Sequence, residues 1–289
     1  MIPAKFDYYA PTTLSEAISL LDQHGYDAKI IAGGQSLIPA MRFRLAQPAV
    51  LIDINRIDGL EYIREEDGYL AIGAMTREAA VDHSPLVKAK YPLLGDTARV
   101  IADPLVRNLA TIGGNLAHAD PANDHPATML AYNATLVATG ANGTRIINID
   151  DFFVGLFTSS LEANEILSEI RIPAPVAGSG SAYLKIERKV GDYAIAAIAV
   201  NLVLQGDLCT AIRIGLTNVA PVPMRASNAE KILQGHTIDG ATIEAAAQAA
   251  AAECDPSADL RGTVEFKRDL VRVLTARTIR KAIERARKN

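Results

Sequence analysis

Two glycine pairs with small polar neighbours are the segments of this sequence best suited to chemistry. The first pair lies in Ala32–Ser36 (Ala-Gly-Gly-Gln-Ser), and the second lies in Thr111–Asn115 (Thr-Ile-Gly-Gly-Asn). Consecutive glycines let the backbone adopt positive φ and remove the Cβ atoms that would keep a ligand at a distance. Exposed N–H groups in such turns form a concavity that binds anions. The two segments together predict one phosphate-rich ligand gripped from two sides.

A Gly-Gly pair on its own predicts only a turn. The residues beside each pair favour a ligand site instead. An apolar run over Lys29–Ala32 precedes the first pair. It predicts a strand that opens into a loop, which is a favoured place for phosphates. Neither segment contains the G-x-G-x-x-G fingerprint or the Gly-Lys-Ser/Thr of a P-loop. The sequence therefore disfavours an ordinary Rossmann or P-loop site.

The cysteines and histidines exclude other kinds of site. The two cysteines, Cys209 and Cys254, lie far apart, whereas an iron–sulfur cluster needs about four thiolates. His118 and His125 lie near the second pair without thiolate or carboxylate company at a ligand spacing, so we predict no metal site. The sequence has no Gly-x-Ser-x-Gly elbow and no nucleophile constellation, so we predict no catalytic residue.

The composition is that of a globular protein, with 49% hydrophobic and 21% charged residues among 289. A net charge of −4 gives no overall attraction to nucleic acid. Eight Arg or Lys residues lie between Lys267 and Arg287, which predicts a solvated face or a subunit contact. No apolar signal core follows Met1 and no run reaches membrane length. We therefore expect a cytoplasmic protein without a transmembrane segment.

The first elements that must position the glycine segments form a β-α-β unit. Thr13 and Glu16 have the spacing of a capping box for a helix that Gly25 can end. Strands are expected over 29–32 and 50–54, with a helix over 36–45 between them. This order favours parallel strands with a right-handed crossover.

Antiparallel pairing is expected beyond residue 60. Asp67-Gly68 and Asn142-Gly143 are hairpin turn signals. Further strands are expected over 60–64, 69–74, 134–139, 145–149, 166–172, 194–204 and 209–216. Further helices are expected over 77–82 with Thr76 as its cap, and over 93–101, 226–233, 241–252 and 265–287. The small, proline-bearing segment 174–181 is the expected domain boundary.

Both glycine segments resemble the paired flavin motifs of the medium, FAD-binding subunits of molybdenum hydroxylases, and within that family carbon monoxide dehydrogenases are the most similar. The resemblance runs from Ile2-Pro3 through Lys185–Tyr193 to the C-terminal helix. It implies an α+β fold with an FAD-binding domain of the molybdopterin dehydrogenase type over 1–176. That domain comprises a small β-α-β part (1–55) and a part with a mixed or antiparallel sheet (56–176). A smaller α+β C-terminal domain over 177–289 would carry a three-stranded antiparallel sheet and helices.

The resemblance also implies how FAD lies. Backbone N–H groups of Gly33–Ser36 and the Ser36 hydroxyl would meet the pyrophosphate, and the backbone of the second segment would complete the phosphate cradle. Carbon monoxide dehydrogenases usually have His where this chain has Gln35, which donates hydrogen bonds but does not titrate near neutral pH. The implied FAD-binding residues of the two segments are Ala32, Gly33, Gly34, Gln35, Ser36, Leu37, Thr111, Gly113, Gly114 and Asn115.

Five further residues match FAD-binding positions of the family. Asp124 would accept hydrogen bonds from the ribose hydroxyls, although it could also be a helix N-cap. Ile101 and Leu161 would line the flavin or adenine pocket, whereas their residue types alone predict core. Lys185 would stabilise the anionic reduced flavin. Tyr193 would pack on the flavin face, and the alternative is a half-buried strand position.

By this resemblance the chain is one subunit of a three-subunit oxidoreductase. It would pass electrons from the [2Fe–2S] clusters of a small subunit through FAD to an external acceptor. A large subunit would hold the molybdenum-pterin cofactor and oxidise the substrate, and two heterotrimers would form a dimer. Any membrane contact would be made through partners at the inner face. The alternatives are the FAD subunit of an aldehyde or N-heterocycle dehydrogenase, a free-standing FAD-dependent reductase, and a module that binds a nucleotide only to stabilise an assembly.

Overall fold

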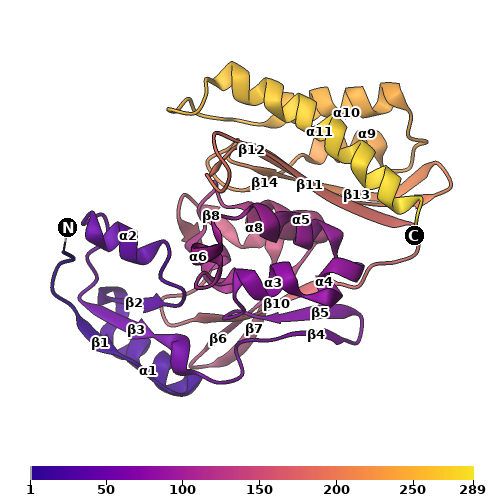
Figure 1. Cartoon of the computed structure of the whole chain (residues 1–289). Coiled ribbons are helices and arrows are strands. Elements are labelled where there is room, and N and C mark those ends of the chain that lie inside the picture. Colours follow the sequence, from indigo (N-terminus) through magenta and orange to yellow (C-terminus); the bar gives the residue numbers. More distant parts are fainter. Residues whose placement is uncertain (1) are drawn as a thin grey trace.

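The computed structural model describes residues 2–289, and its N-terminal part is a small parallel sheet (Figure 1). The strands are β1 (Asp7–Tyr9), β2 (Ala28–Ile31) and β3 (Val50–Asp53), in the spatial order β1-β3-β2. Helix α1 (Leu14–His24) connects β1 to β2, and α2 (Leu37–Arg42) connects β2 to β3. The expected β-α-β start with parallel strands is confirmed.

Local capping explains where α1 begins and ends. Thr13 Oγ1 accepts a hydrogen bond from Glu16 N, and Gly25 follows the helix with φ +53°. The carboxylate of Glu16 accepts from Thr12 N, one residue before the position that a strict capping box requires. Ala17, Ile18 and Leu21 are buried on one face of the helix in a small core shared with β3. The expected cap and stop residues of this helix are therefore confirmed, with the Glu16 contact shifted by one residue.

The second sheet is antiparallel and has the strand order β4-β5-β10-β6-β7. Its strands are β4 (Ile63–Glu66), β5 (Tyr69–Gly73), β6 (Thr135–Gly140), β7 (Gly143–Asn148) and β10 (Ile166–Pro173). Both expected hairpins are present, β4–β5 and β6–β7. A short hairpin of β8 (Phe153–Gly155) and β9 (Thr158–Ser159) lies outside this sheet.

Six helices belong to this part of the chain. They are α3 (Glu78–His83), α4 (Pro85–Lys90), α5 (Pro92–Val100), α6 (Pro104–Arg107), α7 (Ile112–His118) and α8 (Asp124–Tyr132). The expected cap at Thr76 is wrong, because Arg77 precedes α3 without a side-chain cap and the Thr76 hydroxyl bonds to the backbone N and O of Tyr62. Thr76 therefore joins two strand ends instead of starting a helix.

The third sheet contains β11 (Ser179–Glu187), β12 (Ala194–Gln205), β13 (Leu208–Thr217) and the two-residue β14 (Met224–Arg225), paired antiparallel in this order. The expected three-stranded antiparallel sheet is thus present and gains a short fourth strand. Helices α9 (Ser227–Leu233), α10 (Gly240–Glu253) and α11 (Val264–Ala286) cover its outer face, while α5 and α8 lie on the inner face, toward the second sheet (Figure 1).

Burial on both faces explains the apolar run of β12. Ile198 and Val200 belong to the core under α10 and α11, whereas Ala197 and Ala199 belong to the core that α8 shares with the second sheet. Successive side chains of a strand point to opposite faces, and the small residues on the inner face let α8 approach closely. The third sheet is thereby held directly against the helices of the second part.

An ion-pair cluster joins α11 to α5 across this junction. Asp96 on α5 accepts hydrogen bonds from Arg285 Nη1 (2.7 Å) and Lys281 Nζ (3.1 Å), and from Tyr183 N at 3.3 Å. Burial is the largest single influence on the Asp96 carboxyl and raises its pKa, but the Arg285 and Lys281 side chains together hold that pKa below its ordinary value. Part of the basic run on the last helix therefore makes a contact within the chain, in place of the solvated face or subunit contact expected for it.

Two further expectations concern membranes and cysteines. In the described part of the chain, no helix combines the length and the apolar character needed to cross a bilayer. Cys209 and Cys254 are both buried and unbridged.

Candidate cofactor site

The first glycine segment presents a row of free backbone donors. It leaves β2 and enters α2, and Gly34 adopts φ +71°. Within residues 2–289, the amide N–H groups of Gly33, Gly34, Gln35 and Ser36 have no hydrogen-bond acceptor. Gln35 Nε2 donates to Gly33 O at 3.0 Å, which closes the loop on itself. All four residues are only partly buried, so their N–H groups are open to an acceptor from outside the chain, either water or a ligand.

The second segment uses its backbone differently. Thr111 caps α7 and its Oγ1 accepts from Gly114 N. Ile112 N donates to Thr76 O, Gly113 N to Ala74 O and Asn115 N to Thr111 O. The expectation that this backbone completes the phosphate cradle is therefore wrong for residues 112–115, because the helix start and the segment 74–76 already satisfy those donors.

Two side chains of the second segment keep unused hydrogen-bonding capacity. The Thr111 hydroxyl accepts one bond and still has a proton to donate. Asn115 Oδ1 is buried and has no partner within the described chain. A buried polar atom without a partner costs free energy unless a ligand or water satisfies it. The side chains of Thr111 and Asn115 are therefore the groups of this segment that fit a ligand.

The structure brings the two segments into contact. A Cβ atom on Gly33 would lie 2.2 Å from Leu109 O and 2.7 Å from Ala110 Cα. A Cβ atom on Gly114 would lie 2.7 Å from Thr111 Oγ1 and 3.8 Å from Ala32 Cβ. Side chains at these two positions would therefore clash with neighbouring protein atoms. Gly33 is needed so that the first loop can pack against the chain just before the second segment, and Gly114 is needed so that the Thr111 hydroxyl can approach its backbone.

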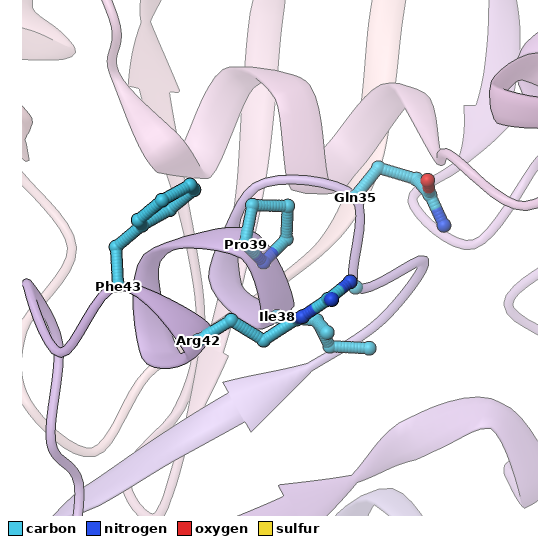
Figure 2. A pocket seen from close by; sticks show the side chains of 6 residues that line it. Gln35, Ile38, Pro39, Arg42 and Phe43 are labelled. Atoms are coloured by element: carbon cyan, nitrogen blue, oxygen red, sulfur yellow. The ribbon is translucent and has the colours of Figure 1, made fainter. Parts of the chain in front are cut away.

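A groove of about 360 Å³ runs beside the first segment. Figure 2 shows side chains along it from the loop to the end of α2. It is lined by Gly34, Gln35, Ile38, Pro39, Arg42 and Phe43. Donors of the loop, an arginine and apolar side chains thus share one surface. Leu37, the last expected contact of this segment, begins α2.

Asp124 lies at the start of α8, but it does not cap the helix. Asn123 occupies the N-cap position, and Asp124 is the first helical residue. The Asp124 side chain is only 7% exposed. Its Oδ1 accepts from Tyr183 OH at 2.6 Å and its Oδ2 from Lys185 Nζ at 3.0 Å. Burial raises the pKa of Asp124, and the neighbouring Lys185 ammonium acts in the opposite direction.

Lys185, Ile101 and Leu161 occupy different surroundings. Lys185 projects from β11 into the same buried cluster as Asp124 and also donates to Val100 O at 3.1 Å. Ile101 directly follows Val100 at the end of α5 and is buried. Leu161 is half-buried and packs against the core of the second sheet. The structure thus brings Ile101, Asp124 and Lys185 together, whereas Leu161 lies in the segment after β9.

Tyr193 lies in the turn before β12, so the alternative of a strand position is wrong. The residue is 43% exposed, and its pKa is raised, chiefly by partial burial. Gly191 has φ +79°, and a Cβ atom there would lie 2.6 Å from Ala102 O, so this turn packs beside Ile101. Tyr193 therefore presents a partly exposed aromatic ring near Ile101, which is also an expected FAD contact.

Sequence reasoning missed the residues that hold this turn. Asp192 Oδ1 accepts from Tyr193 N and from Arg261 Nη2, each at 2.9 Å. The Arg261 guanidinium lies 5.9 Å from the centre of the Tyr193 ring. Arg261 comes from the loop before α11, and nothing in its sequence neighbourhood signals this contact.

Comparison with known proteins places these features in a family. The model for the FAD binding domain in molybdopterin dehydrogenase matches residues 4–175, and the model for the CO dehydrogenase flavoprotein C-terminal domain matches residues 181–282. The chain is 47% identical to the carbon monoxide dehydrogenase medium chain of Hydrogenophaga pseudoflava, over 98% of both chains. It is 34% identical to the glyceraldehyde dehydrogenase medium chain of Sulfolobus acidocaldarius, over 97% of this chain and 99% of that one.

Solved structures agree over the whole length. Carbon monoxide dehydrogenase from Hydrogenophaga pseudoflava, in a form lacking the Mo-pyranopterin moiety, matches with a TM-score of 0.97 and 49% identity over 99% of both chains. Quinoline 2-oxidoreductase from Pseudomonas putida 86 matches with a TM-score of 0.93 and 35% identity, also over 99% of both chains. The two-part α+β fold, the free donors of the first loop and these full-length matches lead to one conclusion: this chain belongs to the family of FAD-binding medium subunits of molybdopterin dehydrogenases.

Proposed function

We propose that this chain is the FAD subunit of a heterotrimeric molybdenum hydroxylase of the carbon monoxide dehydrogenase type. In it, electrons would pass from the [2Fe–2S] clusters of a small subunit through FAD to an external acceptor. When bound, FAD supplies the redox chemistry, because a flavin can accept electrons singly and release them as a pair. The task of this chain is to bind the cofactor and set its orientation and electrostatic surroundings. Substrate oxidation belongs to the large, molybdenum-containing subunit.

The observation that carries this proposal is the set of four free N–H groups at Gly33–Ser36. A pyrophosphate has enough acceptor oxygens to take all of them, and hydrogen bonds to a charged acceptor are stronger than neutral ones. The buried, unpartnered Asn115 Oδ1 and the remaining proton of Thr111 lie on the adjoining segment. These donors and acceptors fit FAD at the junction of the two loops.

The rest of the proposed site lies toward the third sheet. Tyr193 offers an exposed aromatic face for the isoalloxazine, and Ile101 and Leu161 offer apolar contacts. The same assignment divides the chain into an FAD-binding domain over 1–176 and a C-terminal domain over 177–289. The linker between β10 and β11 contains Pro175 and Gly178, which supports a boundary there.

Carbon monoxide is the proposed substrate of the complete enzyme because the medium chains of two carbon monoxide dehydrogenases are 47% and 43% identical to this chain. Relatives that act on other compounds are less similar, such as the glyceraldehyde dehydrogenase medium chain at 34%. The proposed assembly is a dimer of heterotrimers in the cytoplasm, with any membrane contact at the inner face made through partners.

The test is to purify the chain alone and together with candidate small and large subunits. We expect FAD absorbance in the complex, oxidation of carbon monoxide by the complex only, and faster loss of FAD on dilution from the lone chain. Faster loss is expected because partner subunits would shape part of the FAD pocket. A ligand that binds the assembled state stabilises that state, and the lone chain lacks it. Turnover of aldehydes or N-heterocycles, with none of carbon monoxide, would reassign the substrate. Turnover by the lone chain would favour a free-standing reductase, and a complex without bound FAD would refute the proposal.

A further inference from the structure

A buried cluster around Lys185 connects three elements near the proposed flavin contacts. The Lys185 side chain is 3% exposed. Its Nζ donates to Val100 O at the end of α5 (3.1 Å) and to Asp124 Oδ2 at the start of α8 (3.0 Å), and it lies 3.3 Å from Glu187 Oε2 on β11. Two of the three protons of this ammonium are therefore hydrogen-bonded, whereas Glu187 forms an ion pair with it without a hydrogen bond.

We infer that Lys185 is a positioning residue for the cofactor site: it fixes the ends of α5 and α8 against β11, and it does not supply a positive charge to the flavin. This inference rests on the proposed FAD site and concerns how that site is built. The residue after Val100 is Ile101, and the residue bonded to Lys185 on α8 is Asp124. Both are proposed cofactor contacts, so the lysine sets the distance between them.

The charges of the cluster argue against a direct electrostatic role. The ammonium of Lys185 is enclosed by the carboxylates of Asp124 and Glu187, which leaves an excess of one negative charge if all three are ionised. With so little surface exposed, its charge acts first on the carboxylates that touch it. Two of its protons are bound by Val100 O and Asp124 Oδ2, and its charge is shared with two carboxylates of its own chain.

Tyr183 belongs to the same network without carrying a charge. Its hydroxyl is buried and donates to Asp124 Oδ1 at 2.6 Å, opposite the oxygen that Lys185 uses. Burial and the Asp124 carboxylate both raise the pKa of Tyr183, so the phenol stays protonated as the donor. Tyr183 therefore offers a way to loosen Asp124 while every charge is retained.

Three variants of the full chain, purified with its partner subunits, separate positioning from charge. Lys185→Arg keeps the charge but replaces a compact ammonium by a planar fork. Tyr183→Phe removes one bond to Asp124 and no charge. Glu187→Gln changes the charge of the cluster by one unit and leaves the contacts of Lys185 to Val100 and Asp124 in place. The readouts are the dissociation constant of FAD, the reduction potential of the FAD that remains bound, and the melting temperature after FAD is removed.

A positioning role predicts that Lys185→Arg and Tyr183→Phe each raise the dissociation constant of FAD at least fivefold. The potential of the bound FAD should stay within about 15 mV of the wild type. This limit is half of the 30 mV that corresponds to a tenfold change for a two-electron couple. Glu187→Gln should change the affinity less than twofold. A charge role predicts the reverse, with affinity near wild type in all three and a shifted potential only in Glu187→Gln. That result would overturn the inference while leaving the proposed function intact. Absence of FAD from the wild-type complex would instead refute the proposed function.

Lys185→Met gives a second check, because it removes the charge and the three contacts together. If this variant loses its fold, the melting temperature will report the loss, and Lys185→Arg and Tyr183→Phe still decide between the two roles. If it folds and binds FAD with unchanged affinity, Lys185 positions nothing, and the inference is wrong.

Discussion

The contact between the two glycine segments predicts that Gly33→Ala disables the cofactor site by displacing the first loop. The added Cβ would lie 2.2 Å from Leu109 O and 2.7 Å from Ala110 Cα. Ordinary contact between such atoms needs more than 3 Å, so the loop must move by about 1 Å. Both neighbours belong to the backbone, which cannot move aside by changing a rotamer.

The size of the effect follows from the four free N–H groups. Each hydrogen bond to a charged acceptor contributes about 1.5–3 kcal/mol. A displacement of about 1 Å that breaks two of them weakens FAD binding by about 3–6 kcal/mol, or at least about 100-fold. Forcing an extra carbon atom into a packed site also lowers the free energy of unfolding by about 1–3 kcal/mol.

The assay is titration of the apo-protein with FAD, followed by flavin fluorescence, alongside chemical unfolding. Gly59→Ala is the matched control, because Gly59 has φ +81° and no atom within 4 Å of its missing Cβ. That variant carries a backbone cost of about 1–2 kcal/mol without touching the loop, so it shows what lost stability alone does to FAD binding. If Gly33→Ala bound FAD within threefold of Gly59→Ala, the proposed placement of the pyrophosphate would be wrong.

Three further outcomes are expected. Tyr193→Phe should leave the rate of flavin reduction in the complex within about tenfold of the wild-type rate, a barrier change of about 1.4 kcal/mol. Tyr193→Ala should weaken FAD binding. Complete loss of reduction in the Phe variant with FAD retained would contradict this. Gln35→His should make FAD retention pH-dependent between about pH 5.5 and 7.5, with tighter retention at the lower pH, because a protonated imidazole attracts the pyrophosphate; a flat profile would argue against it. Because the pKa of Asp96 is lowered in the folded state, its contribution to stability is present above an unfolded pKa of about 3.9 and is lost as the pH falls through the folded value. Asp96→Asn should therefore cost about 2 kcal/mol at pH 7, less than a fully buried pair because Lys281 and Arg285 remain partly exposed, and should flatten the acid limb of the unfolding curve.

Features that depend on neighbouring residues could be predicted from the sequence. The cap at Thr13, the stop at Gly25 and both hairpin turns were all expected, because capping and turn formation involve residues only a few positions apart. Thr76 shows the limit of such reasoning. Its hydroxyl is as suitable for a cap as that of Thr13, but a strand end 14 residues earlier in the chain takes it.

The sequence predicts which residues lie near the cofactor better than it predicts the contacts between them. The resemblance placed Asp124 and Lys185 near the cofactor, and the structure does bring them together. It did not indicate that they bind each other, because the partners are 61 residues apart and come from different parts of the fold. Arg261, which contacts Asp192 below Tyr193, was missed for the same reason. Such long-range pairs depend on how the third sheet packs against α5 and α8.

The two glycine segments look alike in sequence and use their backbones in opposite ways, and the two residues before each pair account for the difference. Thr111 is placed to cap a helix that begins at Ile112, so the second pair lies inside the first turn of α7 and Gly114 N bonds to the threonine hydroxyl. Neither Ile31 nor Ala32 has a side chain that could cap, and α2 begins only at Leu37, after the first pair has turned with positive φ at Gly34. A glycine pair that follows a capping residue at helix spacing therefore predicts satisfied amides. A pair that separates a strand from a later helix predicts amides free for a ligand.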